Sequence, residues 1–128
     1  MILDSSAVVA ILCEEPGYQD LLGKIGHTRV LGIAAPTVLE SSMIIGTRLK
    51  VDGLSSVGDF LRELGVRILP FSEEHASAAY SAFLRFGKGK HPASLNFGDC
   101  MSYAASKVSG HPLLFVGKDF AKTDIVAA

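Results

Sequence analysis

The chain has little cysteine, almost no net charge and no long apolar run, and these features exclude several classes of protein. Two cysteines in 128 residues are too few for a disulfide framework or a zinc site. A net charge of −1 gives no overall attraction to nucleic acid or membranes, so any basic surface has to be local. No apolar run reaches the roughly 18 residues of a membrane span. Asp4 interrupts the first apolar run and no basic segment precedes it, which argues against a secretory signal. We therefore expect a reduced, cytoplasmic protein without a membrane segment.

Short apolar runs alternate with helical patterns along the chain. The runs cover 2–3, 30–34, 66–71 and 113–116, and they lack the polar–apolar alternation of a half-exposed sheet. Continuous apolar strands separated by helices indicate a parallel sheet covered on both faces. With 48% apolar residues and no linker or repeat, the sequence predicts one α/β domain over residues 1–128.

Several of the predicted helices have a clear apolar face. Tyr18, Leu21, Leu22 and Ile25 follow the i, i+3, i+4, i+7 pattern, and residues 36–50 read as a helix with apolar residues on much of its surface. A later helix carries the apolar residues Val57, Phe60 and Leu64. A small sheet is not expected to cover all three, so this helix is one reason to predict a homodimer.

Four acidic residues fall where a parallel α/β sheet places its ligand sites. Asp4 and Asp119 follow apolar runs, while Glu40 and Asp99 lie in the opening turns of predicted helices. In such a sheet, ligands bind beyond the carboxyl ends of the strands, where helices begin. The fold can therefore bring the four carboxylates to one edge.

Each acid also has a purely structural explanation. Asp4 is a favoured residue for a helix N-cap, and Thr37 with Glu40 matches a T-x-x-E capping box. Asp99 can complement a helix dipole, and Asp119 can be a turn residue. A cap and a ligand are compatible roles for Asp4, because one carboxylate oxygen can cap while the other points elsewhere.

Four carboxylates at one edge would require a cation. Two carboxylates about 4 Å apart repel each other by about 4 kcal/mol at an effective dielectric constant near 20. A cluster must therefore take up protons or bind a metal ion. An all-oxygen site suits Mg²⁺ or Mn²⁺, which activates water and neutralises charge on a phosphoryl group. The pattern favours metal-assisted hydrolysis of a phosphodiester.

Two polar residues accompany these acids. Ser6 lies two residues after Asp4 and either holds a carboxylate or a metal-bound water or contributes to the helix cap. Asn96 lies three residues before Asp99 and either orients Asp99, contacts substrate or forms a loop turn.

The longest polar stretch, residues 87–94, reads as an exposed loop with cations beside it. Arg85, Lys88 and Lys90 form the densest cationic stretch, and a glycine-rich backbone can follow phosphates closely. The alternative is an ordinary solvated loop. His91 in the same loop is interpreted as an exposed or RNA-facing residue rather than a general base.

With these residues the sequence resembles a PIN-domain ribonuclease of the VapC toxin type. The matching segments are Ile2-Leu3-Asp4-Ser5-Ser6-Ala7, Glu40 in its helix, Asn96-Phe97-Gly98-Asp99-Cys100, Tyr103-Ala104, Leu113-Leu114-Phe115-Val116-Gly117-Lys118-Asp119-Phe120 and Thr123-Asp124-Ile125. They extend over almost the whole chain, and their order and spacing are more specific than the Asp-x-Ser pattern alone.

The resemblance implies a three-layer α/β/α fold with a central parallel sheet. It also implies a Mg²⁺- or Mn²⁺-dependent endoribonuclease that cuts single-stranded or looped RNA, a homodimer and a cognate antitoxin. Asp4, Glu40 and Asp99 match the acidic core of the family, and Asp119 matches its more variable fourth acid. Asp124 is the alternative for that fourth position.

Other functions fit the residues less well. An aspartyl phosphatase usually has an Asp-x-Asp motif after its first strand, and here Ser6 takes the second place. A receiver-like signalling domain requires a phosphoacceptor after a middle strand, and neither Asp52 nor Asp59 follows a strand pattern. A catalytically silent PIN-like module that binds RNA or protein is the remaining alternative, and the presence of all four acids disfavours it.

Overall fold

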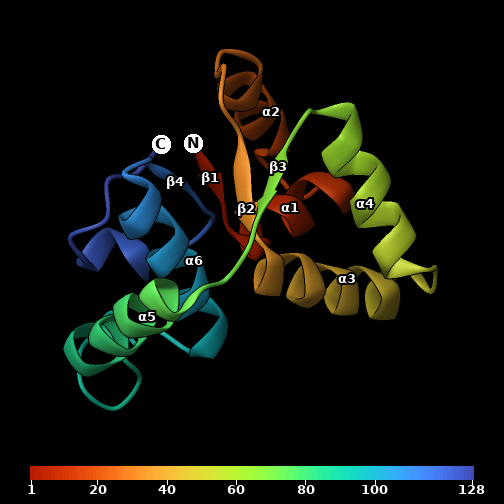
Figure 1. Ribbon diagram of the computed structural model, residues 1–128. Helices are drawn as coiled ribbons and strands as arrows, with labels where there is room; N and C mark the ends of the chain where they lie inside the picture. Colours follow the sequence, from red (N-terminus) through yellow and green to blue (C-terminus); the bar gives the residue numbers. More distant parts are fainter.

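One four-stranded parallel sheet organises the computed structural model, which describes residues 1–128 (Figure 1). The strands are β1 (Ile2–Leu3), β2 (Gly32–Ala34), β3 (Arg67–Leu69) and β4 (Leu113–Leu114), in the spatial order β3-β2-β1-β4. The helices are α1 (Ser5–Leu12), α2 (Tyr18–Gly26), α3 (Ala35–Leu49), α4 (Gly53–Glu63), α5 (Glu73–Phe86) and α6 (Phe97–Ser109), with a short 3₁₀ helix η1 (Phe120–Lys122). The predicted parallel α/β architecture is confirmed.

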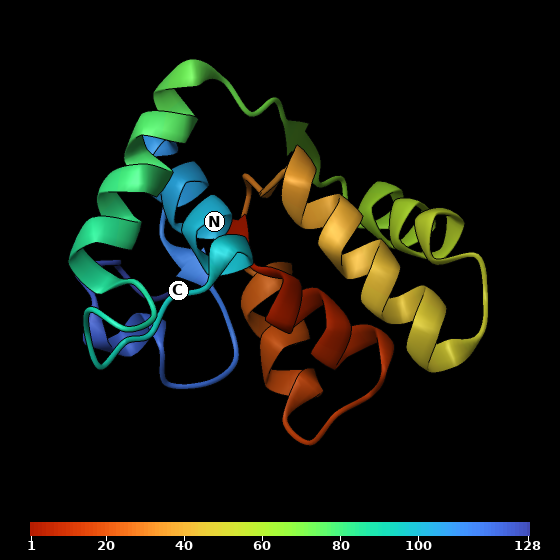
Figure 2. The ribbon, with the colours of Figure 1, turned by 90° about the horizontal axis from the view of Figure 1, so that it is seen from below.

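Both faces of the sheet are covered by helices, which gives three layers. Side chains alternate between the two faces of a strand. Leu3 and Ile33 join one apolar core with residues of α1 to α4, whereas Ile2 and Ala34 join a second core with residues of α5 and α6. Figure 2 shows α5 and α6 on one side of the molecule and α3 and α4 on the other.

The edge strand β3 is less buried than its sequence predicts. Ile68 exposes 51% of its surface, although the run 66–71 reads as a fully buried strand. β3 is an edge strand with only β2 beside it, and Ile68 packs into neither apolar core. The central strands β1 and β2 are buried throughout, as expected.

The helix proposed as an uncovered apolar face is in fact packed into the core. Val57 is completely buried, and Phe60 and Leu64 are partly buried against the core below α1 to α4. That reason for a homodimer is therefore wrong, because α4 packs closely on α3 and turns its apolar side inward. Large exposed apolar side chains lie elsewhere and include Leu39, Met43, Tyr80 and Phe97.

None of the helices combines the length and the apolar character that a membrane crossing requires.

Candidate active site

Asp4 sits between β1 and α1, where one carboxylate oxygen caps the helix and the other has no partner. Its Oδ2 caps α1 by accepting a hydrogen bond from the Ser6 N–H at 3.0 Å, and the Ser6 hydroxyl donates to the same oxygen at 2.5 Å. The residue is only 3% exposed, and its Oδ1 is buried without any hydrogen-bond partner. A buried carboxylate oxygen with no donor is costly, so this atom is available to a ligand.

Ser6 connects two strand ends at the site. Its Oγ accepts a hydrogen bond from the Val116 N–H at 3.0 Å while donating to Asp4. The segment that follows β4 is thereby fixed against the beginning of α1. The predicted role of Ser6 in holding a carboxylate agrees with these contacts.

Glu40 reaches the site from the second turn of α3, not from its opening turn. The helix begins after Ala34, which provides no side-chain cap, so the expected Thr37–Glu40 capping box is wrong. Thr37 is instead buried inside the helix, with its hydroxyl 3.3 Å from that of Ser102. The Glu40 carboxylate accepts a hydrogen bond from the Ser5 hydroxyl.

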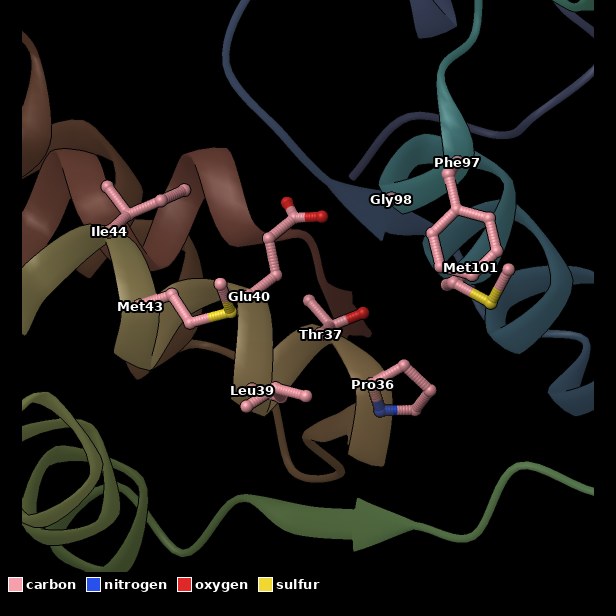
Figure 3. Close-up of a pocket in the computed structure, with 9 residues that line it drawn as sticks. All are labelled: Pro36, Thr37, Leu39, Glu40, Met43, Ile44, Phe97, Gly98 and Met101. Atoms are coloured by element: carbon pink, nitrogen blue, oxygen red, sulfur yellow. The ribbon is translucent and has the colours of Figure 1, made fainter.

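The start of α6 lies against the Glu40 side chain, and both line a hollow between α3 and α6. Figure 3 shows the Glu40 side chain extending from α3 with Gly98 on the facing helix. The hollow is lined by Pro36, Thr37, Leu39, Glu40, Met43, Ile44, Phe97, Gly98 and Met101. Its walls are largely apolar, so Glu40 supplies the charge at this end of the site.

Asp99 is held by a reciprocal capping box at the beginning of α6. The Asn96 N–H donates to Asp99 Oδ2, and the Asp99 N–H donates to Asn96 Oδ1, each at 2.9 Å. Of the roles considered for Asn96, orientation of Asp99 matches this geometry. The helix cap fixes the carboxylate without using its second oxygen.

The electrostatic surroundings of Asp99 bring the four predicted acids together. Burial raises the pKa of Asp99 to about 6, against the opposing effect of its hydrogen bond with the Asn96 N–H. The negative charges of Asp4, Asp119 and Glu40 make smaller contributions to the same rise. All four carboxylates therefore share one electrostatic environment.

Asp119 and Asp124 occupy different surroundings. Asp119 is exposed before η1, and its charge acts on Asp99. Asp124 instead accepts a hydrogen bond from the Tyr103 hydroxyl at 2.7 Å and pairs with Lys107 at 2.9 Å. These partners hold Asp124 against α6, whereas the charge that acts on Asp99 is that of Asp119.

The loop 87–94 is largely exposed, as predicted, but parts of it are anchored to the protein. Ala93 is completely buried, and the Lys88 N–H donates to the Leu95 carbonyl at 3.0 Å. Lys90 lies over the ring of Phe83 at 5.3 Å. Neither lysine forms an ion pair, so both keep a free positive charge.

Arg85 and His91 have structural partners of their own. Arg85 pairs with Asp124 at 3.4 Å and lies 4.6 Å from the centre of the Phe86 ring. His91 is half-buried, its Nδ1 accepts from the Ala93 N–H at 3.0 Å, and its ring meets Phe86 edge-on. His91 is therefore not the exposed residue that was expected, because its ring packs against its own loop, and its RNA-facing role stays a prediction.

Two residues of the site were not singled out from the sequence. Ser5 donates to Glu40, and Gly98 faces the same carboxylate. The available signal for Gly98 was a glycine placed inside the first turn of a helix, where most other residues form helices better. Ser5 gave no signal, because it stands next to Ser6 in an ordinary capping sequence.

Comparisons with known proteins agree with this arrangement. A family model described as PIN domain matches residues 1–126. The chain is 40% identical over 127 residues to a Ribonuclease VapC from Mycolicibacterium smegmatis, covering 99% of this chain and 98% of that protein. It is 41% identical over 128 residues to Ribonuclease VapC36 of Mycobacterium tuberculosis, covering 98% and 91% respectively.

Solved structures share the fold at much lower identity. Mycobacterium tuberculosis VapC20, a toxin described as cleaving the sarcin–ricin loop, superposes with a TM-score of 0.79 at 13% identity, covering 99% of this chain and 97% of that one. VapBC2 from Rickettsia felis, bound to a promoter DNA fragment, gives a TM-score of 0.74 at 15% identity, with 99% and 96% covered. The fold, the spacing of the acids and the full-length relatives lead to one conclusion: the chain belongs to the PIN-domain family, in its VapC ribonuclease branch.

Proposed function

We propose that the chain is a metal-dependent endoribonuclease that hydrolyses RNA phosphodiester bonds and acts as the toxin of a toxin–antitoxin pair. The observation that carries this proposal is the shared environment of Asp4, Glu40, Asp99 and Asp119 at the carboxyl end of the sheet. Relatives at about 40% identity over nearly the whole chain carry the name Ribonuclease VapC, which supports RNA as the substrate.

The residues fit a divalent cation of the Mg²⁺ or Mn²⁺ type. Asp4 Oδ1 is a buried acceptor without a partner, and all the candidate ligands are oxygens. No group of three or more Asp, Glu, His or Cys side chains is arranged to enclose a metal alone. The pKa of Asp99 still responds to three other acids, because electrostatic interactions between charges extend well beyond the length of a metal–ligand bond. Water and substrate oxygens would complete the coordination, as is usual for Mg²⁺.

The residues of the site fall into metal ligands and residues that hold those ligands in place. Asp4, Asp99, Glu40 and Asp119 would hold the cation, which when bound supplies an activated water and charge neutralisation at the scissile phosphate. Ser6 fixes Asp4, and Asn96 fixes Asp99 through its backbone N–H.

Flanking phosphates require cations outside this acidic centre, and we propose that Lys88 and Lys90 supply them. Neither lysine is ion-paired, and Lys88 lines a groove that continues to Asn96 and Phe97 at the start of α6. Arg85 is a weaker candidate because Asp124 already pairs with it.

Replacing Lys88 and Lys90 together with alanine is expected to weaken RNA binding largely independently of sequence. The slope of the logarithm of the binding constant against the logarithm of the salt concentration should become shallower by up to about 0.7 for each single-strand phosphate contact that is lost. RNA affinity is measured across a salt series with Ca²⁺ in place of EDTA, so that the site is occupied without cleavage. The control replaces Lys24 and Arg29, which removes the same charge; equal affinities and parallel slopes in both double variants would show that the loop is only a connector.

Two protein partners belong to the proposal. The first is a cognate antitoxin that blocks the site, a role supported by solved VapBC and other toxin–antitoxin complexes with the same fold. The second is another copy of the chain. Exposed Leu39, Met43 and Phe97 at the hollow give the homodimer a better motive than α4 did, and light scattering at micromolar concentration is expected to give twice the monomer mass. RNA as substrate and two unpaired thiols fit the cytoplasm as the compartment.

A covalently closed single-stranded RNA circle tests the proposed activity against its alternative. The circle has no ends, so only an endonuclease can convert it to a linear product. We expect linear RNA to appear with the purified chain and Mg²⁺ or Mn²⁺. Binding that leaves the circle intact would favour a silent RNA-binding module, and neither binding nor cleavage would remove RNA from the proposal.

A further inference from the structure

We infer that Gly98 and Ser5 are positioning residues for the Glu40 carboxylate. Glycine at residue 98 is required to leave room for this carboxylate and not for the stability of the fold. The inference rests on the proposed function, since it concerns how one acid of the metal centre is held in place.

The Glu40 carboxylate is confined from two directions. From α1, the Ser5 hydroxyl donates a hydrogen bond to Glu40 Oε1, and Ser5 is only 7% exposed. From α6, the backbone of Gly98 comes so close that an added Cβ would overlap Glu40 Oε2 and lie 2.7 Å from Glu40 Cδ (Figure 3). Ser5 therefore provides a hydrogen-bond donor for the carboxylate, and Gly98 provides the space that the carboxylate occupies.

The backbone at residue 98 gives no separate reason for glycine. Its φ lies outside the left-handed region that favours glycine, and it stands in the first turn of α6. Alanine is the better helix former by about 0.5–1 kcal/mol. The three atoms nearest to an added Cβ all belong to the far end of the flexible Glu40 side chain, and none to the backbone.

An alanine at residue 98 is therefore accommodated by movement of Glu40. The carboxylate would swing away from Gly98 and from the Ser5 hydroxyl, while α6 keeps or gains stability. This separates the two possible roles of the glycine, because a purely structural glycine would lower stability when replaced, whereas a positioning glycine alters only the acidic centre.

The test combines Mn²⁺ affinity, measured by calorimetry, with thermal unfolding of the metal-free protein. Gly98→Ala is expected to weaken Mn²⁺ binding by about 10- to 100-fold, the usual effect of disturbing a residue that supports a metal ligand. The unfolding temperature should stay level or rise. The control is Gly58→Ala, a helical glycine of α4 whose added Cβ meets only the end of the Arg62 side chain, and it should leave Mn²⁺ binding unchanged.

A double-mutant cycle with Glu40→Ala decides whether Gly98 acts through Glu40. Once the carboxylate is removed, adding Gly98→Ala should change Mn²⁺ affinity no further. An equal loss in both backgrounds, or no loss in the wild-type background, would overturn the inference. Ser5→Ala is expected to weaken binding in the same manner, and Ser5→Thr, which keeps the hydroxyl, should restore most of it.

A readout without metal separates this inference from the proposed function. In ¹³C-glutamate-labelled protein, the Glu40 Cδ resonance should shift in both Gly98→Ala and Ser5→Ala, while those of the other five glutamates stay in place. Wild-type protein that binds no Mn²⁺ would count against the proposed function alone. An unmoved Glu40 resonance in both variants would count against the positioning role alone.

Discussion

Asp99→Asn is expected to reduce RNA cleavage at least about a hundredfold while the fold is kept or becomes more stable. Asparagine retains the size of the side chain and an oxygen that can accept from the Asn96 N–H, so the start of α6 remains capped. It removes one of the four charges that would hold the cation. Cleavage rates of the purified variant and wild type check the first part, and undiminished cleavage would falsify it.

The stability of metal-free Asp99→Asn gives a second, independent result. Burial and the neighbouring acids raise the pKa of Asp99 from its ordinary 3.8 to about 6, so the native state binds more protons than the unfolded state between these values. Wild-type stability should therefore fall as pH rises from about 4 to about 6 and stay low above that. The full difference corresponds to at most about 3 kcal/mol, and partial exposure to water reduces this to about 1 kcal/mol.

Asp99→Asn should remove that fall in stability with pH. At pH 7 and without metal, the variant is expected to unfold a few degrees above wild type, since about 1 kcal/mol corresponds to roughly 3–6 °C in a domain of this size. Added Mg²⁺ should then raise the unfolding temperature of wild type much more than that of the variant. Identical unfolding temperatures for the two proteins from pH 4 to pH 8 would contradict the shared acidic environment.

Gly53→Ala is expected to destabilise the protein by about 3 kcal/mol, the upper end of the usual cost of overpacking. Gly53 is buried at the start of α4, where an added Cβ would overlap the Ser42 carbonyl oxygen and lie 2.8 Å from the Gly46 nitrogen. These are backbone atoms of α3, so no side-chain rotation can relieve the overlap. The two helices would have to separate, and overpacking of this kind costs about 1–3 kcal/mol and sometimes more.

A matched control lies five residues away in the same helix. Gly58→Ala places its methyl group near only the end of the Arg62 side chain, and alanine is the better helix former by about 0.5–1 kcal/mol. Denaturant unfolding should therefore show one destabilised and one slightly stabilised variant. Equal effects at both positions would mean that helix propensity, and not the close contact of α3 with α4, controls residue 53.

The architecture could be predicted from the sequence because its signals are local. Apolar runs bounded by helical patterns indicate a parallel sheet, and Asp4, Asn96 and Asp99 stand where helix caps belong. Burial of individual faces depends on neighbours that no local pattern reveals. The core position of Val57 follows from α3 packing on α4, and Ile68 is exposed because neither apolar core includes it.

The residues of the site also include some that local sequence patterns reveal and some that depend on contacts between distant parts of the chain. The acids are recognisable one by one from their positions at strand and helix ends, whereas their supporting contacts join residues far apart in the chain. Ser5 reaches Glu40 across 35 positions, and Val116 reaches Ser6 across 110. The proposal of Asp119 rather than Asp124 as the fourth acid likewise rests on the contact of Asp124 with Tyr103.

RNA cleavage by the wild-type chain, before and after removal of metal, tests the central claim most directly. Treatment with EDTA is expected to reduce the rate of cleavage of a single-stranded RNA at least about a hundredfold, and excess Mg²⁺ or Mn²⁺ should restore the rate. Asp99→Asn protein purified in parallel controls for contaminating nucleases, which would cleave equally in both preparations. Cleavage that depends on the intact Asp99 but continues undiminished in EDTA would contradict a metal centre built from these four carboxylates.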